Sequence, residues 1–295
     1  MKVLLYARHV KTENAKYILE LAEQASNCSF ELFTTAQIHA FLREAGFSGK
    51  IGVLDTHSDL QVNPIDMLVT LGGDGTILQA TTLVQNLGIP ILGINLGRLG
   101  FLASIEKRFL RESFQQIIDK NFTVEERTML FLDADPEVFG ELSFALNDFT
   151  IHKRDTSSMI TIHAFINGEF LNSYWADGII VSTPTGSTGY SLSCGGPIVF
   201  PQSGNFVITP VAPHNLTVRP LVISDESEVS FSIEGRSENY LCTLDSRSKT
   251  ITSDHKLTVR KCDFSTRLVK LGNMSFQKTI HEKLSWCSDT RNWKS

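Results

Sequence analysis

The sequence predicts two domains, an α/β domain built on a parallel sheet and a second domain made mainly of β-strands. Short apolar runs alternate with helical stripes in the first part of the chain, which is typical of a parallel sheet with helices on both faces. After about Glu125 the helical stripes give way to short runs rich in β-branched and aromatic residues. The length of 295 residues suits one or two domains of ordinary size.

The elements of the first domain follow in order. Apolar runs predict strands at Val3–Tyr6, Phe30–Phe33, Asp66–Leu71 and Ile89–Asn95. Apolar residues at helical spacing predict helices from Ala15 to Ala25, from Ile38 to Ala45 and from Ile77 to Val84. Gly46 follows the second of these helices, at a position where glycine commonly ends a helix.

The second part of the chain is predicted to form strands and hairpins. Asn167-Gly168 lies between two β-rich runs and is a strong hairpin signal. The predicted strands are Leu142–His152, Met159–Ile166, Glu228–Ile233, Leu241–Leu244, Lys256–Arg260 and Arg267–Leu271. The last predicted element is a short helix at Thr279–Trp286.

Composition excludes several classes of protein. Hydrophobic residues make up 42% and charged residues 20%, as in a globular protein with a sizeable core. The net charge of -5 argues against a nucleic-acid partner held by a broad basic surface. We expect no signal peptide and no membrane span, because the first apolar run is short and Arg8 interrupts it. The odd count of five cysteines without a CxxC pair argues against a disulfide framework or a structural zinc site.

The first candidate motif is Gly72-Gly73-Asp74-Gly75-Thr76, between a predicted strand and a predicted helix. Glycines let an anion approach the backbone, and a helix N-terminus offers N–H groups, so the motif indicates phosphate binding. A tight turn at a strand end is the alternative. The motif matches neither the Walker A loop nor the GxGxxG fingerprint. Asp74 is a candidate general base for an attacking hydroxyl, or a hydrogen-bonded turn aspartate.

Two further motifs are shorter. Asn95–Leu102 also follows a predicted strand and carries Arg98 between two glycines, which suits either a phosphate contact or a solvated loop. Asn147-Asp148 interrupts the apolar stretch from Leu142 to Ile151. This pair is either a surface turn or a recognition site for ribose hydroxyls and base edges.

The densest motif is Asp177–Pro197, which joins a predicted strand to a loop rich in hydroxyl groups and glycines. Such a loop supplies O–H and N–H donors for phosphates, riboses and an amide. It does not match the GxSxG nucleophile elbow. A flexible linker is the alternative, but the apolar flanks and the interior Pro184 and Tyr190 favour an ordered loop.

Together and in this order, these motifs resemble the NAD kinase family. The resemblance extends through Pro213-His214 to Val222 and closes near Lys283–Trp286, so that only the first ~65 residues lack a distinctive motif. Diacylglycerol-type lipid kinases and phosphofructokinases have loops like Gly72–Thr76. The stretch from Ser182 to Pro197 is far more specific to NAD kinases.

The resemblance implies a fold and a reaction. It implies a Rossmann-like α/β domain of residues 1–125 with 272–295, and a β-rich NAD-binding domain of residues 126–271. It implies a cytoplasmic homodimer or homotetramer that uses ATP with a divalent cation, Mg²⁺ or Mn²⁺, to phosphorylate the 2′-hydroxyl of the adenosine ribose of NAD. Positioning and charge neutralisation would then supply most of the catalysis.

The resemblance also assigns site residues. Asp74 matches the proton acceptor, and Gly72, Gly73, Gly75 and Thr76 match the phosphate-donor loop. The positions that match NAD contacts are Asp74, Gly75, Asn147, Asp148, Ser158, Trp175, Asp177, Thr188, Gly189, Tyr190, Ser191, Leu192, Ser193 and Arg247. The metal ligands are not assigned.

Several positions depart from the family pattern. Gln79 stands where relatives often have a basic residue, Gly189 and Cys194 where alanine is common, and Arg247 where relatives often have glutamine. A lipid kinase would need a deep apolar cleft for acyl chains, which the hydroxyl-rich loop does not suggest. A non-catalytic dinucleotide sensor would have no need of a base at Asp74.

Overall fold

A computed structural model describes residues 1–10, 14–28, 30–97, 100–103, 105–154, 158–236, 238–272 and 275–286. The chain divides into two compact units. Unit 1 comprises Met1–Glu126 and Thr266–Ser295, and unit 2 comprises Arg127–Ser265. In the described part of the chain no helix is both long and apolar enough to cross a membrane.

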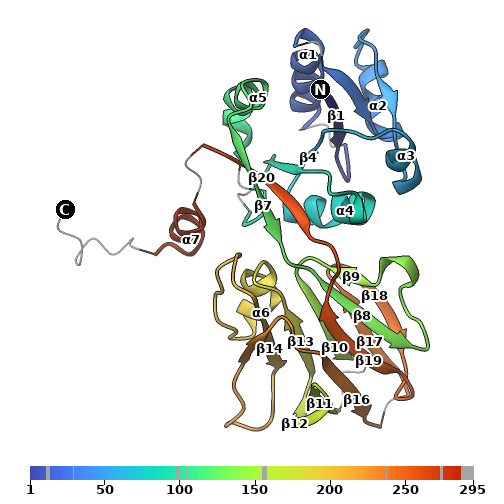
Figure 1. The fold of residues 1–295 in the computed structure, drawn as a ribbon, viewed down its shortest axis with the longest axis vertical. Coiled ribbons are helices and arrows are strands. Elements are labelled where there is room, and N and C mark those ends of the chain that lie inside the picture. The colour runs from blue at the N-terminus through green and yellow to red at the C-terminus, as the bar shows by residue number, and fades with distance from the viewer. Residues whose placement is uncertain are drawn as a thin grey trace, which may run out of the picture. The chain divides into compact units, whose positions relative to one another are not determined.

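Unit 1 is an α/β domain, as predicted, with one sheet of eight strands (Figure 1). The strand order is β3-β2-β1-β4-β5-β20-β7, and β6 pairs with β5. The strands are β1 Lys2–Tyr6, β2 Glu31–Thr34, β3 Gly52–Val53, β4 Met67–Leu71, β5 Ile91–Asn95, β6 Ile105–Glu106, β7 Phe122–Arg127 and β20 Thr266–Leu271. The pairs from β3 through to β20 are parallel.

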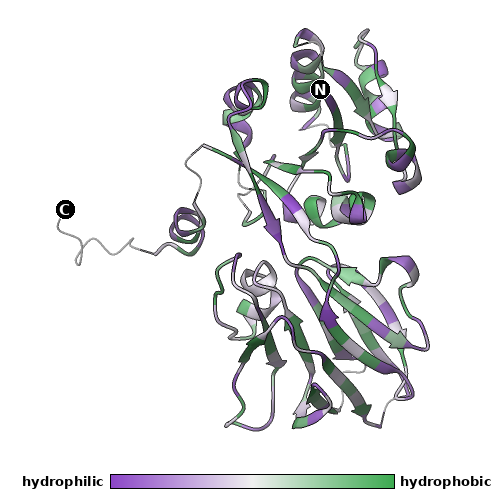
Figure 2. Ribbon diagram, in the orientation of Figure 1, coloured by the Kyte–Doolittle hydropathy of each residue, from purple (hydrophilic) through white to green (hydrophobic). Residues whose placement is uncertain are grey.

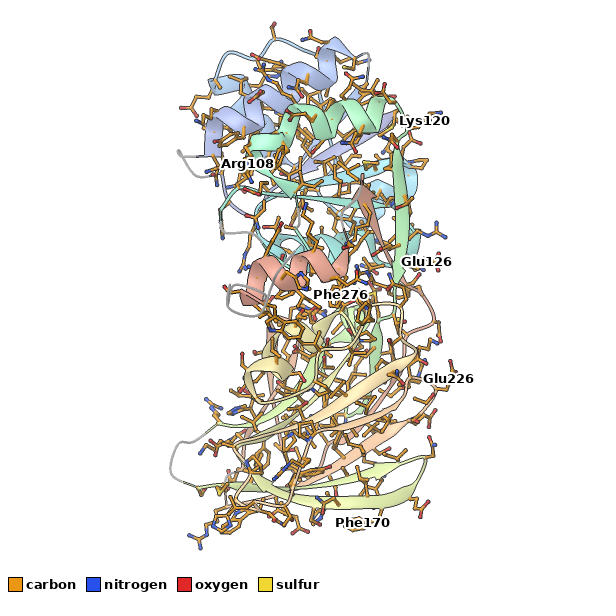
Figure 3. All side chains as sticks on the ribbon, turned by 90° about the vertical axis from the view of Figure 1, so that its left-hand side faces the viewer. Arg108, Lys120, Glu126, Phe170, Glu226 and Phe276 are labelled. Carbon is orange, nitrogen blue, oxygen red and sulfur yellow. The ribbon has the colours of Figure 1, made fainter. Side chains whose placement is uncertain are left out.

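Helices α1 to α5 lie between strands of unit 1 in the sequence, and α7 follows its last strand. They are α1 Ala15–Asn27, α2 Ala36–Glu44, α3 His57–Val62, α4 Asp74–Val84, α5 Leu110–Ile118 and α7 Phe276–Leu284, with 3₁₀ turns at Gln85–Leu87 and Lys107–Phe109. All residues of β4 and β5 are buried, as expected of parallel strands covered on both faces. Figure 3 labels Phe276, where α7 begins.

One predicted strand lies in a different domain from the one that the sequence assigned. The β-rich domain that the resemblance implies, residues 126–271, includes the predicted strand Arg267–Leu271. The structure begins this strand at Thr266 and pairs it in parallel with β5, so that it completes the sheet of unit 1. Alternating burial looks the same in either setting, and the partner strand is more than 170 residues away, so no local pattern shows it.

Unit 2 consists of two six-stranded sheets with orders β15-β14-β13-β10-β17-β18 and β12-β11-β16-β19-β8-β9. The first sheet contains β10 Asp148–Lys153, β13 Gly178–Ser182, β14 Asn205–Val211, β15 Leu221–Ser224, β17 Tyr240–Leu244 and β18 Arg247–Ile251. The second contains β8 Leu130–Asp135, β9 Phe144–Ala145, β11 Ile160–Ile166, β12 Glu169–Ala176, β16 Val229–Glu234 and β19 Lys256–Lys261. Short helical turns occur at Gly140–Leu142, Gly186–Thr188 and, as α6, at Tyr190–Ser193.

The core of unit 2 draws residues from both sheets. Phe149 of β10 stacks on Phe231 of β16 with ring centroids 5.7 Å apart, and the same buried cluster includes Ile179 and Phe206. Figure 2 colours much of β13 and β14 as hydrophobic, in keeping with their complete burial apart from Asn205. This packing gives the site residues of the first sheet a rigid base.

Two local predictions can be compared directly. Asn167 and Gly168 both adopt positive φ and form the two-residue loop between β11 and β12, as the hairpin signal indicated. The predicted strand Leu142–His152 is instead interrupted. A 3₁₀ turn precedes β9, and β10 begins only at Asp148. The break falls at Asn147, the polar position inside that apolar run.

Candidate active site

The glycine-rich segment Gly72–Thr76 joins β4 to α4. The N–H of Gly72 donates to the carbonyl oxygen of Ile94 at 3.0 Å, which continues the hydrogen bonding of the sheet. A Cβ on Gly72 would lie 2.2 Å from Oγ1 of Thr76, so a larger residue there would have to displace the Thr76 side chain. Gly73, the N-cap residue of α4, and Gly75 have open space at the place of a Cβ. An anion can therefore approach the backbone at the N-terminus of α4.

Asp74 lies in the first turn of α4 and binds the second glycine motif. Its carboxylate accepts hydrogen bonds from the N–H groups of Phe101 (2.9 Å), Leu102 (3.1 Å) and Ala103 (2.9 Å). We call Asp74 with these three N–H groups the Asp74 cradle. An ionised carboxylate has about four acceptor positions, so one remains for a ligand hydroxyl.

Gly100 makes the Asp74 cradle possible. A Cβ at this position would lie 1.8 Å from Oδ1 of Asp74. Asn95 supports the same segment, because its Nδ2 donates to the carbonyl oxygen of Ala103 at 3.3 Å. Two motifs that the sequence showed separately thus form one structure. Arg98 lies outside the described residues.

In unit 2, Asn147 and Asp148 meet the hydroxyl-rich loop at one end of the first sheet. Asp148 opens β10 and pairs with Ser182, the last residue of β13, after which the loop begins. A Cβ on Gly186 would lie 2.1 Å from the carbonyl oxygen of Asn147. At Gly189 a Cβ would be 3.9 Å from both Nδ2 of Asn147 and Oδ2 of Asp148, so these two side chains face Gly189.

Several hydroxyl groups of this loop hold the loop itself. Oγ of Ser187 donates to the carbonyl oxygen of Pro184 at 2.7 Å. Ser191, which the resemblance matched to an NAD contact, is fully buried, and its Oγ lies 2.8 Å from Oγ1 of Thr209. Thr188, Gly189, Leu192 and Ser193 are at least partly accessible, and Tyr190 is exposed. The loop is therefore ordered by its own polar groups, with its accessible residues around α6.

Two residues beside this site were not singled out from the sequence. Nε2 of His152 lies 3.2 Å from the hydroxyl of Tyr190, and Nζ of Lys153 lies 2.6 Å from Oδ1 of Asp177. Both stand at the end of β10, directly after the apolar stretch that ends at Ile151. Their partners become neighbours only through the pairing of β10 with β13.

The electrostatics around Asp148 are unusual. Burial, and then the nearby Asp245 carboxylate, raise the pKa of Asp148 to about 7. Oδ1 of Asn147 is buried and has no hydrogen-bond partner within the described part of the chain. A buried acceptor of this kind is stabilised when a ligand donates to it.

The remaining predicted contacts lie elsewhere in unit 2. Ser158 and Trp175 line a surface cavity of about 560 Å³ together with Glu234 and Arg236. Trp175 also packs on His214, with ring centroids 4.3 Å apart. The guanidinium of Arg247 donates to the carbonyl oxygens of Leu142 and Phe144, so this side chain is already engaged within the protein.

The described residues include no cluster of three or more His, Cys, Asp and Glu side chains suited to hold a metal ion. A Mg²⁺ or Mn²⁺ ion often keeps most of its contacts with substrate phosphates and water.

Comparison with known proteins gives a consistent result for both units. The family model described as "ATP-NAD kinase N-terminal domain" matches residues 3–122, and the one described as "ATP-NAD kinase C-terminal domain" matches residues 146–271. The NAD kinase of Flavobacterium johnsoniae is 43% identical over 294 residues, which cover 99% of this chain and 100% of that protein. The NAD kinase of Cytophaga hutchinsonii is 52% identical over 227 residues, or 77% and 78% of the two chains.

Solved structures resemble the whole chain. Yeast NADH kinase complexed with NADH has a TM-score of 0.87 and 26% identity, and the match covers 100% of this chain and 90% of that one. An NAD kinase from Archaeoglobus fulgidus in complex with ATP has a TM-score of 0.74 and 23% identity, over 97% and 99% of the two chains.

Proposed function

Because this chain belongs to the NAD kinase family, we propose that it transfers the γ-phosphoryl group of ATP to the 2′-hydroxyl of the adenosine ribose of NAD, giving NADP and ADP. Family membership rests on full-length relatives and on models for both halves of the chain. The resemblance drawn from the motifs alone is thereby confirmed at the level of the family.

The observation that carries the proposal is the meeting of Asn147 and Asp148 with the loop at Gly189. The side chains of Asn147 and Asp148 face Gly189. The buried acceptor Oδ1 of Asn147 has no hydrogen-bond donor within the described part of the chain. Ribose hydroxyls and an amide are suitable donors. Asp177, Thr188, Tyr190, Leu192 and Ser193 are the further proposed contacts, with Trp175 and Ser158 in their own cavity.

For the phosphate donor we propose the loop Gly72–Thr76. Gly73 and Gly75 leave the backbone open, and the N-terminus of α4 favours negative charge. A divalent cation bound with ATP would neutralise charge on the β- and γ-phosphates. The phosphates themselves are its proposed principal ligands.

We propose Asp74 as the proton acceptor. The 2′-oxygen forms a bond to the γ-phosphorus, the bond from that phosphorus to the β–γ bridging oxygen breaks, and ADP leaves. The proton of the 2′-hydroxyl passes to Asp74. The N–H groups of Phe101, Leu102 and Ala103 orient the carboxylate without supplying a proton, because backbone amides remain protonated.

The setting of the enzyme is also a proposal. We propose a cytoplasmic homodimer or homotetramer, on the ground of the family resemblance. Size-exclusion chromatography with light scattering measures the oligomeric state directly.

The test is NADP formation by the purified protein with NAD, ATP and magnesium, beside Asp74→Asn. We expect NADP from the wild type and a turnover lower by about 10²–10⁴-fold in the variant, with NAD binding retained. Asp254→Asn, at an exposed turn position, is the matched control. A folded wild type that makes no NADP with ATP or polyphosphate would overturn the proposal.

A further inference from the structure

The hairpin loop between β17 and β18 holds the backbone of the Asn147-Asp148 segment. Oδ2 of Asp245 accepts the N–H of Leu146 at 3.0 Å, and Oδ1 accepts those of Asn147 at 2.7 Å and Asp148 at 3.3 Å. In return the N–H of Asp245 donates to the carbonyl oxygen of Asp148 at 2.9 Å. We call Asp245 with these three N–H groups the Asp245 cradle.

Thr183 completes the backbone hydrogen bonds of the same three residues. Its Oγ1 donates to the carbonyl oxygen of Leu146 at 2.6 Å, and its N–H donates to that of Asn147 at 2.9 Å. Every backbone N–H and C=O from Leu146 to Asp148 therefore has a partner within the protein. Only the side chains of Asn147 and Asp148 remain to meet a ligand.

Asp245 occupies a tight turn with positive φ, a conformation that glycine, asparagine and aspartate tolerate best. Leu244 pairs with Arg247, so Asp245 and Ser246 form a two-residue loop, and Asp245 has a φ of +52°. Glycine adopts this conformation without strain. What sets Asp245 apart from a glycine in this turn is its carboxylate, which accepts the three N–H groups described above.

Arg247, from the same hairpin, binds the backbone just before Leu146. Its guanidinium binds the carbonyl oxygens of Leu142 and Phe144 and lies over the ring of Phe144, 5.5 Å from the centroid. One hairpin thus fixes the chain from Leu142 to Asp148.

We propose that Asp245 is a positioning residue for dinucleotide binding: its carboxylate fixes the backbone of Leu146–Asp148 and so aims the side chains of Asn147 and Asp148 at the ligand. This inference rests on the proposed function, since it takes Asn147 and Asp148 as NAD contacts. Asp245 itself does not need to touch NAD.

The charge of the Asp245 carboxylate also affects its neighbour Asp148, which an uncharged turn residue would not do. The groups that face Asp148 are Asp245 from the hairpin and Tyr190 and Cys194 from α6, while Arg247 faces Asp245. Burial raises the pKa of Asp245, while three N–H donors and Arg247 act to lower it. Burial, and then the Asp245 carboxylate, raise the pKa of Asp148 to about 7.

The test compares Asp245→Asn and Asp245→Gly with the wild type. Asparagine keeps the shape and tolerates positive φ, and glycine relieves the turn, but both remove the charge. We expect the KM for NAD to rise about 10–100-fold in each, with the KM for ATP changed less than about threefold, since lost bonds to a charged group cost this much in affinity. Asp254→Asn serves again as the control, on the neighbouring β18–β19 turn.

A pH profile provides the second readout. An ionised Asp148 accepts from ribose hydroxyls, so the KM for NAD should fall as pH rises through about 7 in the wild type. Without the Asp245 anion, the pKa of Asp148 drops and the midpoint of the profile moves to lower pH. A merely structural change would leave that midpoint in place.

The outcomes are distinct. An unchanged KM for NAD and an unchanged midpoint in both variants would overturn the inference. So would an equal loss toward NAD and ATP, which would show general damage to the fold. If the wild type made no NADP, that result would overturn the proposed function and not the role of Asp245. Calorimetric NAD binding to the wild type and Asp245→Asn would then still decide the role of Asp245, because the variant must bind more weakly.

Discussion

The two cradles use one hydrogen-bond pattern for opposite purposes. In unit 1, Asp74 accepts three consecutive N–H groups, and the carboxylate is itself the proposed reactive group. In unit 2, Asp245 accepts three consecutive N–H groups, and the proposed reactive side chains belong to the residues it holds. In the Asp74 cradle, three backbone N–H groups orient the carboxylate of Asp74. In the Asp245 cradle, the carboxylate orients the backbone that carries Asn147 and Asp148.

The surroundings of the two carboxylates fit this difference. Asp74 begins a helix between two open glycines, Gly73 and Gly75, where a ligand can reach it. Asp245 lies in a tight hairpin with Arg247 beside it, and its pKa is raised by burial. Access to the ligand, rather than the hydrogen-bond pattern, therefore distinguishes a reactive carboxylate from a positioning one.

The largest effect should come from crowding the first cradle at Gly100. In Gly100→Ala the added Cβ would meet Oδ1 of Asp74 at 1.8 Å and displace the carboxylate. We expect kcat to fall about 100-fold, because a shift of about 1 Å in a reacting group costs this much. The KM for NAD should stay near the wild-type value if the second cradle is independent.

Gly97→Ala is the matched control for this change. A Cβ at Gly97 has its nearest neighbour at 3.9 Å, so the variant should keep its activity. Full activity in Gly100→Ala would show that the position of the Asp74 carboxylate does not limit turnover.

The second largest effect should be a dependence of the free energy of unfolding on pH that comes from the Asp245 cradle. The second cradle places Asp148 beside Asp245 and raises the pKa of Asp148 to about 7. A carboxyl with a raised pKa favours the folded state at low pH, and this contribution is lost as pH rises from about 4 to 7. We expect the free energy of unfolding of the wild type to fall by about 3 kcal/mol over this range from this group.

Asp148→Asn should remove that dependence. The variant should differ least from the wild type near pH 4 and exceed it in stability increasingly up to pH 8, as measured by urea unfolding at both pH values. Parallel curves for the two proteins from pH 4 to pH 8 would contradict the raised pKa of Asp148.

The smallest effect should come from removing the contact between His152 and the hydroxyl of Tyr190. Tyr190→Phe removes the hydroxyl that lies 3.2 Å from Nε2 of His152. We expect the KM for NAD to rise about fivefold, the usual worth of one partly exposed hydrogen bond. His152→Leu should give a similar rise, and the double variant should add little to either single change. Additive effects would mean that the two side chains act separately.

Sequence reasoning identified the acid of the first cradle but not that of the second. Gly72–Thr76 and Asn147-Asp148 break apolar runs, so they are visible locally. Asp245 looks like a common turn residue, and its amide partners lie up to 99 residues earlier in the chain. Only the pairing of β10 with β17 brings them together.

For the fold, too, the sequence predicts local elements better than their distant partners. Apolar runs predicted the central strands β1, β4 and β5 of unit 1, and the Asn167-Gly168 turn signal predicted the β11–β12 hairpin. These local signals failed for β3, which has only two residues, and for the domain of β20, whose partner is distant. Strand identity is local information, whereas strand partnership is a property of the folded chain.

The place of β20 has a consequence for biosynthesis. In the sheet of unit 1, β20 lies between β5 and β7, yet it is translated after all of unit 2. At roughly 5–20 residues per second, the ribosome needs several seconds to add the residues between β7 and β20. During that interval β7 has no neighbour in its own sheet. Unit 1 can therefore reach its final strand order only after all of unit 2 has been translated, whereas unit 2 is a continuous stretch that is complete before β20 is made.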